Sequence, residues 1–220
     1  MSKYLQRDLE RLQNQLMSLC GSVERMIGQA TEVLCERKTE LSAEVLAADE
    51  VVDQTEVEIE EECLKILALH QPFAGDLRHL ASVLKINSDL ERIADLACNI
   101  AERGACLHQY PYFPIPDNLP RMIGIATEMV RLSLDAFVDT DAELARKIID
   151  QDRSVDELHL LVIAELKSLM EQESDIVDAA LHCFSASRHV ERIADHAVNI
   201  AEDVIYLATG EIVRHRFENI

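Results

Sequence analysis

Glu191-Arg192-Ile193-Ala194-Asp195-His196-Ala197-Val198-Asn199-Ile200-Ala201-Glu202 is the second copy of a segment that first appears as Glu91-Arg92-Ile93-Ala94-Asp95-Leu96-Ala97-Cys98-Asn99-Ile100-Ala101-Glu102. Ten of the twelve positions are identical, and the copies lie 100 residues apart. Self-similarity at a fixed spacing indicates a duplicated structural unit. The chain is therefore predicted to consist of two similar halves.

Each copy has the pattern of an amphipathic helix. At 100° per residue, Glu91, Asp95, Asn99 and Glu102 fall within about 80° of arc and form one polar stripe. Ile93 and Ile100 lie on the opposite side. The apolar side is expected to pack on other helices, and the polar stripe is expected to face outward. Such a stripe is either a solvated face or a set of ligands for a hard cation.

Apolar residues recur at three- and four-residue steps along most of the chain, which predicts long helices. We expect helices at about 4–36, 44–69, 73–106, 118–138, 141–171 and 174–209. Ser42 is a candidate cap for the second helix, Pro72 suits the first turn of the third, and Asp141 and Gly210 are further boundary signals. A kink is considered near Ala48–Asp49.

A proline-rich segment separates the two halves. Four of the five prolines lie within 110–120, and proline clusters mark boundaries between helices. The predicted fold is all-α, with two tandem, internally repeated three-helix bundles. The predicted domains are 1–108, a linker at 109–118, and 119–220.

The net charge and the absence of long apolar runs each argue against one class of partner. The formal charge is −20, the wrong sign for a nucleic-acid binder, so no nucleic-acid partner is expected. No apolar run reaches the length of a membrane span, and no direct membrane insertion is expected. The six cysteines show no disulfide pattern, and the N-terminus lacks the features of a signal peptide. A cytoplasmic location is predicted.

Four pairs of acids recur at matching places. Glu91 and Asp95, and Glu191 and Asp195, belong to the repeated segment, and the middle helix of each half adds one further pair, Asp49 with Asp53 and Asp152 with Asp156. Acids four residues apart on a helix repel each other. A bridging metal offers a reason for placing such pairs four times, because carboxylate oxygens suit iron, manganese and magnesium, and zinc as well. Ordinary solvated faces are the alternative.

No set of residues suggests catalysis, and the chain is predicted not to be an enzyme. Gly-rich phosphate loops and Ser/His/Asp sets are missing. His196 has Leu96 as its counterpart and is interpreted as a local surface or interface residue, and His79, His182 and His189 are assigned no site role. Arg92 and Arg192 are expected to pair with acids on a neighbouring helix, with an anion site as the alternative. The alternative function is a carboxylate-bridged metalloenzyme or metal-storage protein.

With these motifs, the sequence resembles the PhoU family of bacterial phosphate-signalling regulators over almost its whole length. The resemblance rests on Gln71-Pro72, Gly75-Asp76-Leu77-Arg78, Leu84-Lys85-Ile86-Asn87, Glu91-Arg92-Ile93-Ala94-Asp95 and the segment His189 to Tyr206. Cys98 stands where many relatives have an aliphatic residue or threonine, and it is not expected to touch a proposed ligand.

The resemblance implies two similar three-helix bundles with metal sites on their surface. By position the ligands would be Asp49, Asp53, Glu91 and Asp95 in one half, and Asp152, Asp156, Glu191 and Asp195 in the other. It also implies a negative regulator of phosphate uptake and of the phosphate-starvation response. Such a protein links the ATPase subunit of the phosphate ABC transporter to a sensor histidine kinase. Family members commonly form dimers or larger assemblies, and a homodimer is predicted. The acidic segment Glu56 to Glu62 is a candidate partner surface, with a solvated face as the alternative.

Overall fold

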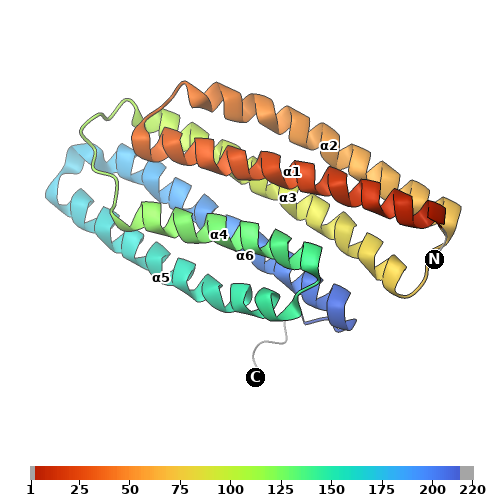
Figure 1. Ribbon diagram of the computed structural model, residues 1–220. Helices are drawn as coiled ribbons and strands as arrows, with labels where there is room; N and C mark the ends of the chain where they lie inside the picture. Colours follow the sequence, from red (N-terminus) through yellow and green to blue (C-terminus); the bar gives the residue numbers. More distant parts are fainter. Residues whose placement is uncertain (1–2, 214–220) are drawn as a thin grey trace.

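The computed structural model describes residues 3–213, with no strand among them. The first half contains α1 (Lys3–Glu36), α2 (Leu41–His70) and α3 (Gly75–Leu107). The second half contains α4 (Asn118–Asp139), α5 (Ala142–Gln172), the short 3₁₀ helix η1 (Ser174–Ile176) and α6 (Val177–Thr209). The predicted all-α fold with two three-helix sets is confirmed (Figure 1).

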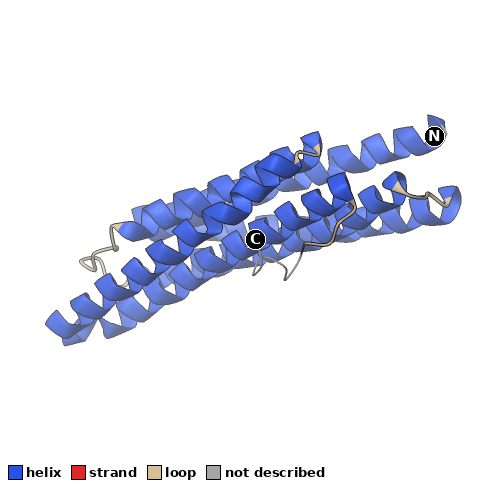
Figure 2. Ribbon diagram, turned by 90° about the horizontal axis from the view of Figure 1, so that it is seen from below, coloured by secondary structure: helices blue, strands red, loops and turns tan. Residues whose placement is uncertain are grey.

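Each set of three helices packs as an antiparallel bundle, and the long axes of the two bundles run side by side (Figure 2). The periodic apolar residues of α1, among them Leu12, Leu16 and Val23, are fully buried. Burial of that stripe supplies the main favourable free energy for a helix of this length, because isolated helices are only marginally stable in water. The same pattern recurs in α4 with Met122, Met129 and Phe137.

Helices α3 and α6 join the two halves. They pack against each other in antiparallel directions, and α1 and α4 make a smaller second contact between the halves (Figure 1). The alanines of the repeated segment make this close packing possible: Ala94, Ala97, Ala194 and Ala197 are all fully buried. We call the contact between α3 and α6 the seam.

Several helix ends agree with the sequence signals. The Asp141 carboxylate caps α5 by accepting hydrogen bonds from the backbone N–H groups of Glu143 and Leu144, at 2.9 and 3.0 Å. Gly210 adopts a positive φ of 78° and ends α6, as predicted. Thr140 does the same for α4 with a φ of 54°.

Other helix boundaries were predicted wrongly. Helix α2 begins at Leu41, and its N-cap residue Glu40 makes no side-chain capping hydrogen bond, so Ser42 lies inside the helix. Helix α3 begins at Gly75, which leaves Pro72 in the preceding loop. Helix α2 also runs without interruption through Ala48 and Asp49.

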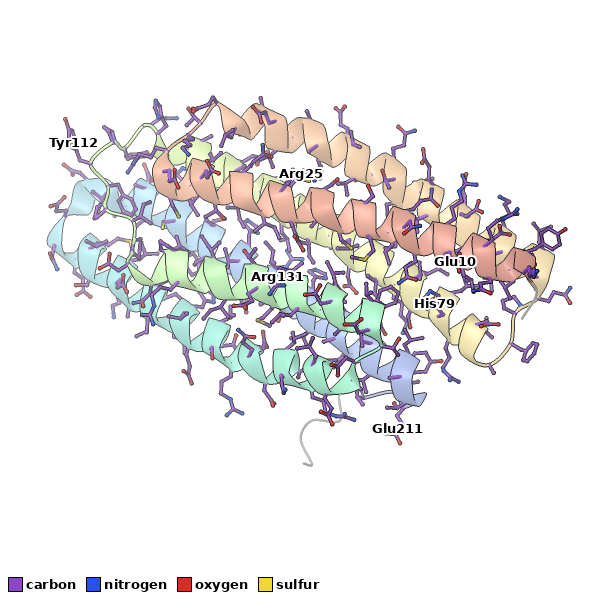
Figure 3. All side chains as sticks on the ribbon, viewed as in Figure 1. Glu10, Arg25, His79, Tyr112, Arg131 and Glu211 are labelled. Carbon is purple, nitrogen blue, oxygen red and sulfur yellow. The ribbon has the colours of Figure 1, made fainter. Side chains whose placement is uncertain are left out.

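The segment between α3 and α4 is tied to the end of α1. Arg37, whose φ of 60° ends the helix, donates hydrogen bonds to the carbonyl oxygens of Leu107 and Phe113, both at 2.8 Å. Tyr112 in the same segment is 97% exposed and projects away from the helices, at the opposite end of the molecule from Glu10 (Figure 3). One arginine therefore fixes the point where the chain crosses from the first half to the second.

Candidate metal centre

The eight predicted ligands form two groups, one in each half. Carboxylate cluster one contains Asp49 and Asp53 of α2 with Glu91 and Asp95 of α3. In this group the pKa of Asp49 is raised, first by burial and then by the charges of Asp53 and Asp95. The pKa of Glu91 is also raised by burial, with further contributions from Asp95 and Asp53. The acids of the two helices therefore lie close enough for their charges to repel.

Carboxylate cluster two has the same plan, with Asp152 and Asp156 on α5 and Glu191 and Asp195 on α6. The pKa of Asp152 is raised to about 6, first by burial and then by the charges of Asp156, Asp195 and Glu191. The pKa of Asp195 is raised by burial, then by Glu191 and Asp156. All four acids of this group are thus coupled electrostatically.

The repeated polar stripes lie beside the middle helices, and only part of each stripe faces open solvent as expected. The side chain of Glu91 is 22% exposed and that of Asp95 is 46% exposed. Acids of α2 lie close to this stripe, since the charges of Asp53 and Glu56 act on Glu91. This position partly dehydrates the carboxylates, which raises their pKa values.

The two arginines of the repeat differ in their ion pairs, and in the described part of the chain neither pairs with an acid of a neighbouring helix as predicted. Arg92 pairs within its own helix, with Glu91 and Asp95, both at 3.3 Å. Within residues 3–213, Arg192 makes no ion pair shorter than 4 Å, but its charge opposes the rise in the pKa of Asp195. An arginine therefore pairs directly with two acids of carboxylate cluster one, whereas in carboxylate cluster two Arg192 acts on Asp195 from beyond ion-pair distance.

The chemistry of both clusters fits a hard metal ion. Each offers four carboxylates, and the Oδ1 atom of Asp49 is buried with no hydrogen-bond partner among the described residues. A bound cation would relieve the repulsion that raises these pKa values. In the described part of the chain, no three His, Cys, Asp or Glu side chains already converge on one point. Binding a metal would therefore require the carboxylates to rotate toward each other.

Two side chains that lie beside carboxylate cluster one, Glu56 and Cys98, were not assigned to it from the sequence. Glu56 stands one turn after Asp53 on α2, and its charge contributes to the raised pKa of Glu91. The Cys98 thiol donates to the carbonyl oxygen of Val45 at 3.8 Å, and the charge of Asp49 acts on it. Burial, followed by the charge of Asp49, raises the pKa of Cys98 to about 12, which keeps it a neutral thiol. The position of Glu56 seven residues after Asp49, two turns along the same face, could have revealed it.

His196 and His79 have partners outside the two clusters. Nδ1 of His196 lies 2.8 Å from Oδ1 of Asp89 across the seam, which makes His196 an interface residue. The His79 ring stacks on Phe137 of α4, with 5.5 Å between ring centroids, and burial lowers the pKa of His79. Neither histidine is directed into a carboxylate cluster as a ligand.

Known proteins similar to this chain share one family description. The family model described as "PhoU domain" matches residues 16–104 and again 119–204. A "Phosphate-specific transport system accessory protein PhoU homolog" from Aquifex aeolicus is 42% identical over 96% of this chain and 95% of the relative. A protein of the same description from Deinococcus radiodurans is 39% identical over 96% of this chain and 99% of the relative.

Two solved structures of proteins with the same family description have a similar fold. The crystal structure of PhoU from Pseudomonas aeruginosa superposes with a TM-score of 0.90 at 35% identity, covering 94% of this chain and 99% of that one. The phosphate transport system regulatory protein PhoU from Streptococcus pneumoniae gives a TM-score of 0.88 at 27% identity, covering 95% and 99%. Between residues 3 and 213, no helix is both long enough and apolar enough to cross a bilayer.

Proposed function

This chain belongs to the PhoU family, and from that premise we propose that it is a negative regulator of phosphate uptake and of the phosphate-starvation response. The observation that carries the proposal is the match of both halves to the family model, together with relatives named as accessory proteins of phosphate-specific transport. The protein acts as an adaptor between the ATPase subunit of the phosphate ABC transporter and a sensor histidine kinase. It works in the cytoplasm as a homodimer.

An adaptor needs surfaces that two partners can contact, and α2 offers one. Its outer face carries the exposed acids Glu58, Glu60 and Glu61, with Val57 and Leu64 also exposed at 51% and 53%. Apolar side chains surrounded by charge are typical of a contact surface that stays soluble when it is unoccupied. The acidic character favours a basic patch on the partner.

The two carboxylate clusters are proposed as the metal sites of this regulator. Asp49, Asp53, Glu91 and Asp95 would hold one ion or group of ions, and Asp152, Asp156, Glu191 and Asp195 another. Iron, zinc, manganese and magnesium are the candidate metals. The bound cation would supply positive charge at the helix surface, and the chain's own carboxylates would orient it by bridging two helices.

Binding to purified partners tests the adaptor role. The full chain would be titrated by biolayer interferometry against the transporter ATPase subunit and, separately, against the cytoplasmic part of the kinase. We expect saturable binding to both, and at least tenfold weaker binding to one of them for a Glu58→Lys/Glu60→Lys/Glu61→Lys variant. A matched variant on α5, Glu143→Lys/Asp150→Lys/Glu157→Lys, reverses the same number of exposed charges and should bind like the wild type.

A cellular assay provides the second test. A strain that lacks this protein should express phosphate-starvation genes in phosphate-rich medium, and the wild-type gene should restore repression. Absence of binding to both partners, together with unchanged gene expression in the deletion strain, would rule out the proposed function.

A further inference from the structure

The seam carries a second site that the carboxylate clusters do not include. Two contacts fix its antiparallel register: Lys85 Nζ lies 2.8 Å from Asp203 Oδ1, and Asp89 Oδ1 lies 2.8 Å from His196 Nδ1. Asp89 also accepts a hydrogen bond from Asn199 at 3.3 Å. Because the halves repeat at 100 residues, each contact has a counterpart elsewhere on the same seam.

The corresponding positions on the other part of the seam hold no acidic residue. The pair Lys85 and Asp203 corresponds to Ser185 and Arg103, and the pair Asp89 and His196 corresponds to His189 and Leu96. Where the first location holds two carboxylates of the chain itself, the second holds an arginine and a histidine. We call Arg103, Ser185, His189 and the adjacent Arg188 the basic seam cluster.

Two buried side-chain nitrogens of this cluster are left without partners. Nε of Arg103 and Nδ1 of His189 are buried, and neither has a hydrogen-bond partner among residues 3–213. Nε2 of His189 lies 3.4 Å from the Ser185 hydroxyl, which links these two side chains. Buried polar groups are nearly always satisfied in folded proteins. When Nε2 of His189 accepts the Ser185 hydroxyl proton, Nδ1 carries the ring proton, and both unpartnered nitrogens then require an acceptor.

The charges in the cluster are equally uncompensated. Arg103, Arg188 and Arg192 lie close enough for their charges to act on the His189 imidazole, and Glu102 is the one acid with an opposing effect. None of the three arginines makes an ion pair shorter than 4 Å within the described part of the chain. Arg192 also acts on Asp195 of carboxylate cluster two, which leaves Arg103 and Arg188 as the uncompensated arginines beside His189 in a protein of net charge −20.

We propose that the basic seam cluster binds a small tetrahedral oxoanion of the inorganic phosphate class. Arginine presents paired N–H donors that match the oxygens of such an anion, and the Ser185 hydroxyl and the His189 ring add further donors. The anion takes the place that carboxylates of the chain occupy at the counterpart location. This inference goes beyond the function proposed above and does not depend on it.

Isothermal titration calorimetry with inorganic phosphate tests the site. The full chain is first treated with a chelator, so that phosphate cannot bind through metal at the carboxylate clusters, and potassium chloride of equal ionic strength serves as the blank. We expect one saturable phosphate site per chain and at least tenfold weaker binding for Arg103→Gln. Arg146→Gln removes an exposed arginine of α5 and should leave binding unchanged.

Ser185→Asp gives a second and independent test. The register places residue 185 opposite Arg103, so the new carboxylate supplies the missing anion, as Asp203 does for Lys85. We expect this variant to stay folded, to melt at a higher temperature and to lose phosphate binding. Phosphate heats that match the chloride blank, or equal binding by the wild type and Ser185→Asp, would overturn the proposal. So would an equal loss in Arg146→Gln. If Arg103→Gln does not fold, the Ser185→Asp result decides.

Discussion

Lys85 of α3 and Asp203 of α6 form an ion pair across the seam, with 2.8 Å between Nζ and Oδ1, and the Asp203 side chain is 2% exposed. Replacing Lys85 with methionine would remove this ion pair from a buried carboxylate. We expect the free energy of unfolding to fall by about 2 kcal/mol, measured by urea denaturation. Lys167→Met removes an exposed lysine whose contact with Glu171 is 3.9 Å long, and it should change the free energy by less than about 0.5 kcal/mol. Equal effects of the two substitutions would contradict the structural role of Lys85.

Asp152 should make stability depend on pH. Its pKa rises from 3.8 in the unfolded chain to about 6 in the folded protein, so the folded state binds the proton more tightly. Its contribution to the free energy of unfolding is therefore greatest below pH 4 and is lost as the pH rises through 6. Two pKa units correspond to about 2.7 kcal/mol, and solvent screening of this half-exposed group reduces the effect to about 1 kcal/mol.

The Asp152→Asn variant tests whether the contribution of Asp152 to stability falls as the pH rises. Without metal it should be more stable than the wild type at pH 7 by about 1 kcal/mol, and most of that gain should disappear at pH 4. Asp150→Asn, two residues earlier and exposed, is the matched control and should give no pH-dependent difference. A gain for Asp152→Asn that is as large at pH 4 as at pH 7 would refute the electrostatic explanation.

Metal should stabilise the protein through the carboxylate clusters. At a free Mn²⁺ concentration about 100 times the dissociation constant, a single site would add about 2.7 kcal/mol to the free energy of unfolding. A variant with Glu91, Asp95, Glu191 and Asp195 all changed to alanine should show no such gain and no stoichiometric metal in elemental analysis. A control variant carries alanine at Glu58, Glu60, Glu61 and Glu157, which lie outside the clusters. Metal content that is equal in the wild type and the cluster variant would leave the clusters as solvated faces.

Gly104 and Gly124 should respond in opposite ways to substitution by alanine. A Cβ atom at Gly104 would lie 2.8 Å from the backbone of Leu34, so α3 would be pushed away from α1, at a cost of about 1–3 kcal/mol. At Gly124 on α4 nothing lies within 4 Å of the added atom. There the helix propensity of alanine should add about 0.5–1 kcal/mol. Thermal unfolding of the two variants measures both effects, and a stable Gly104→Ala protein would disprove the close contact.

The helices were predictable because their signal is local and repeated many times. In α1, Leu5, Leu12 and Leu16 recur on one face and are buried on that face. The boundaries were less predictable because competing signals are weak. Ser42 was expected to cap α2, but a turn of hydrogen bonds after Arg37, including Leu41 N–H to the Lys38 carbonyl at 3.1 Å, starts the helix earlier.

The acids of the two clusters could be found in the sequence because they lie within the repeat. Their metal ligation stays a prediction. The basic seam cluster could not be found in the same way, because His189 and Arg103 acquire their meaning only from the register between α3 and α6. Ion-pair partners were predicted poorly for the same reason: Arg92 pairs within its own helix, and no local signal separates that choice from a partner on a neighbouring helix.

The unequal charges of the seam also disfavour contact between two first halves during synthesis. The first half leaves the ribosome before the second, with its side of the seam uncovered. If two first halves met in the native register, Lys85 of each would face Arg103 of the other, because Arg103 stands where the second half has Asp203. Like charges at both ends of the contact oppose that association. The nascent chain is thereby kept available for its own second half, and premature pairing between neighbouring chains on one messenger RNA is disfavoured.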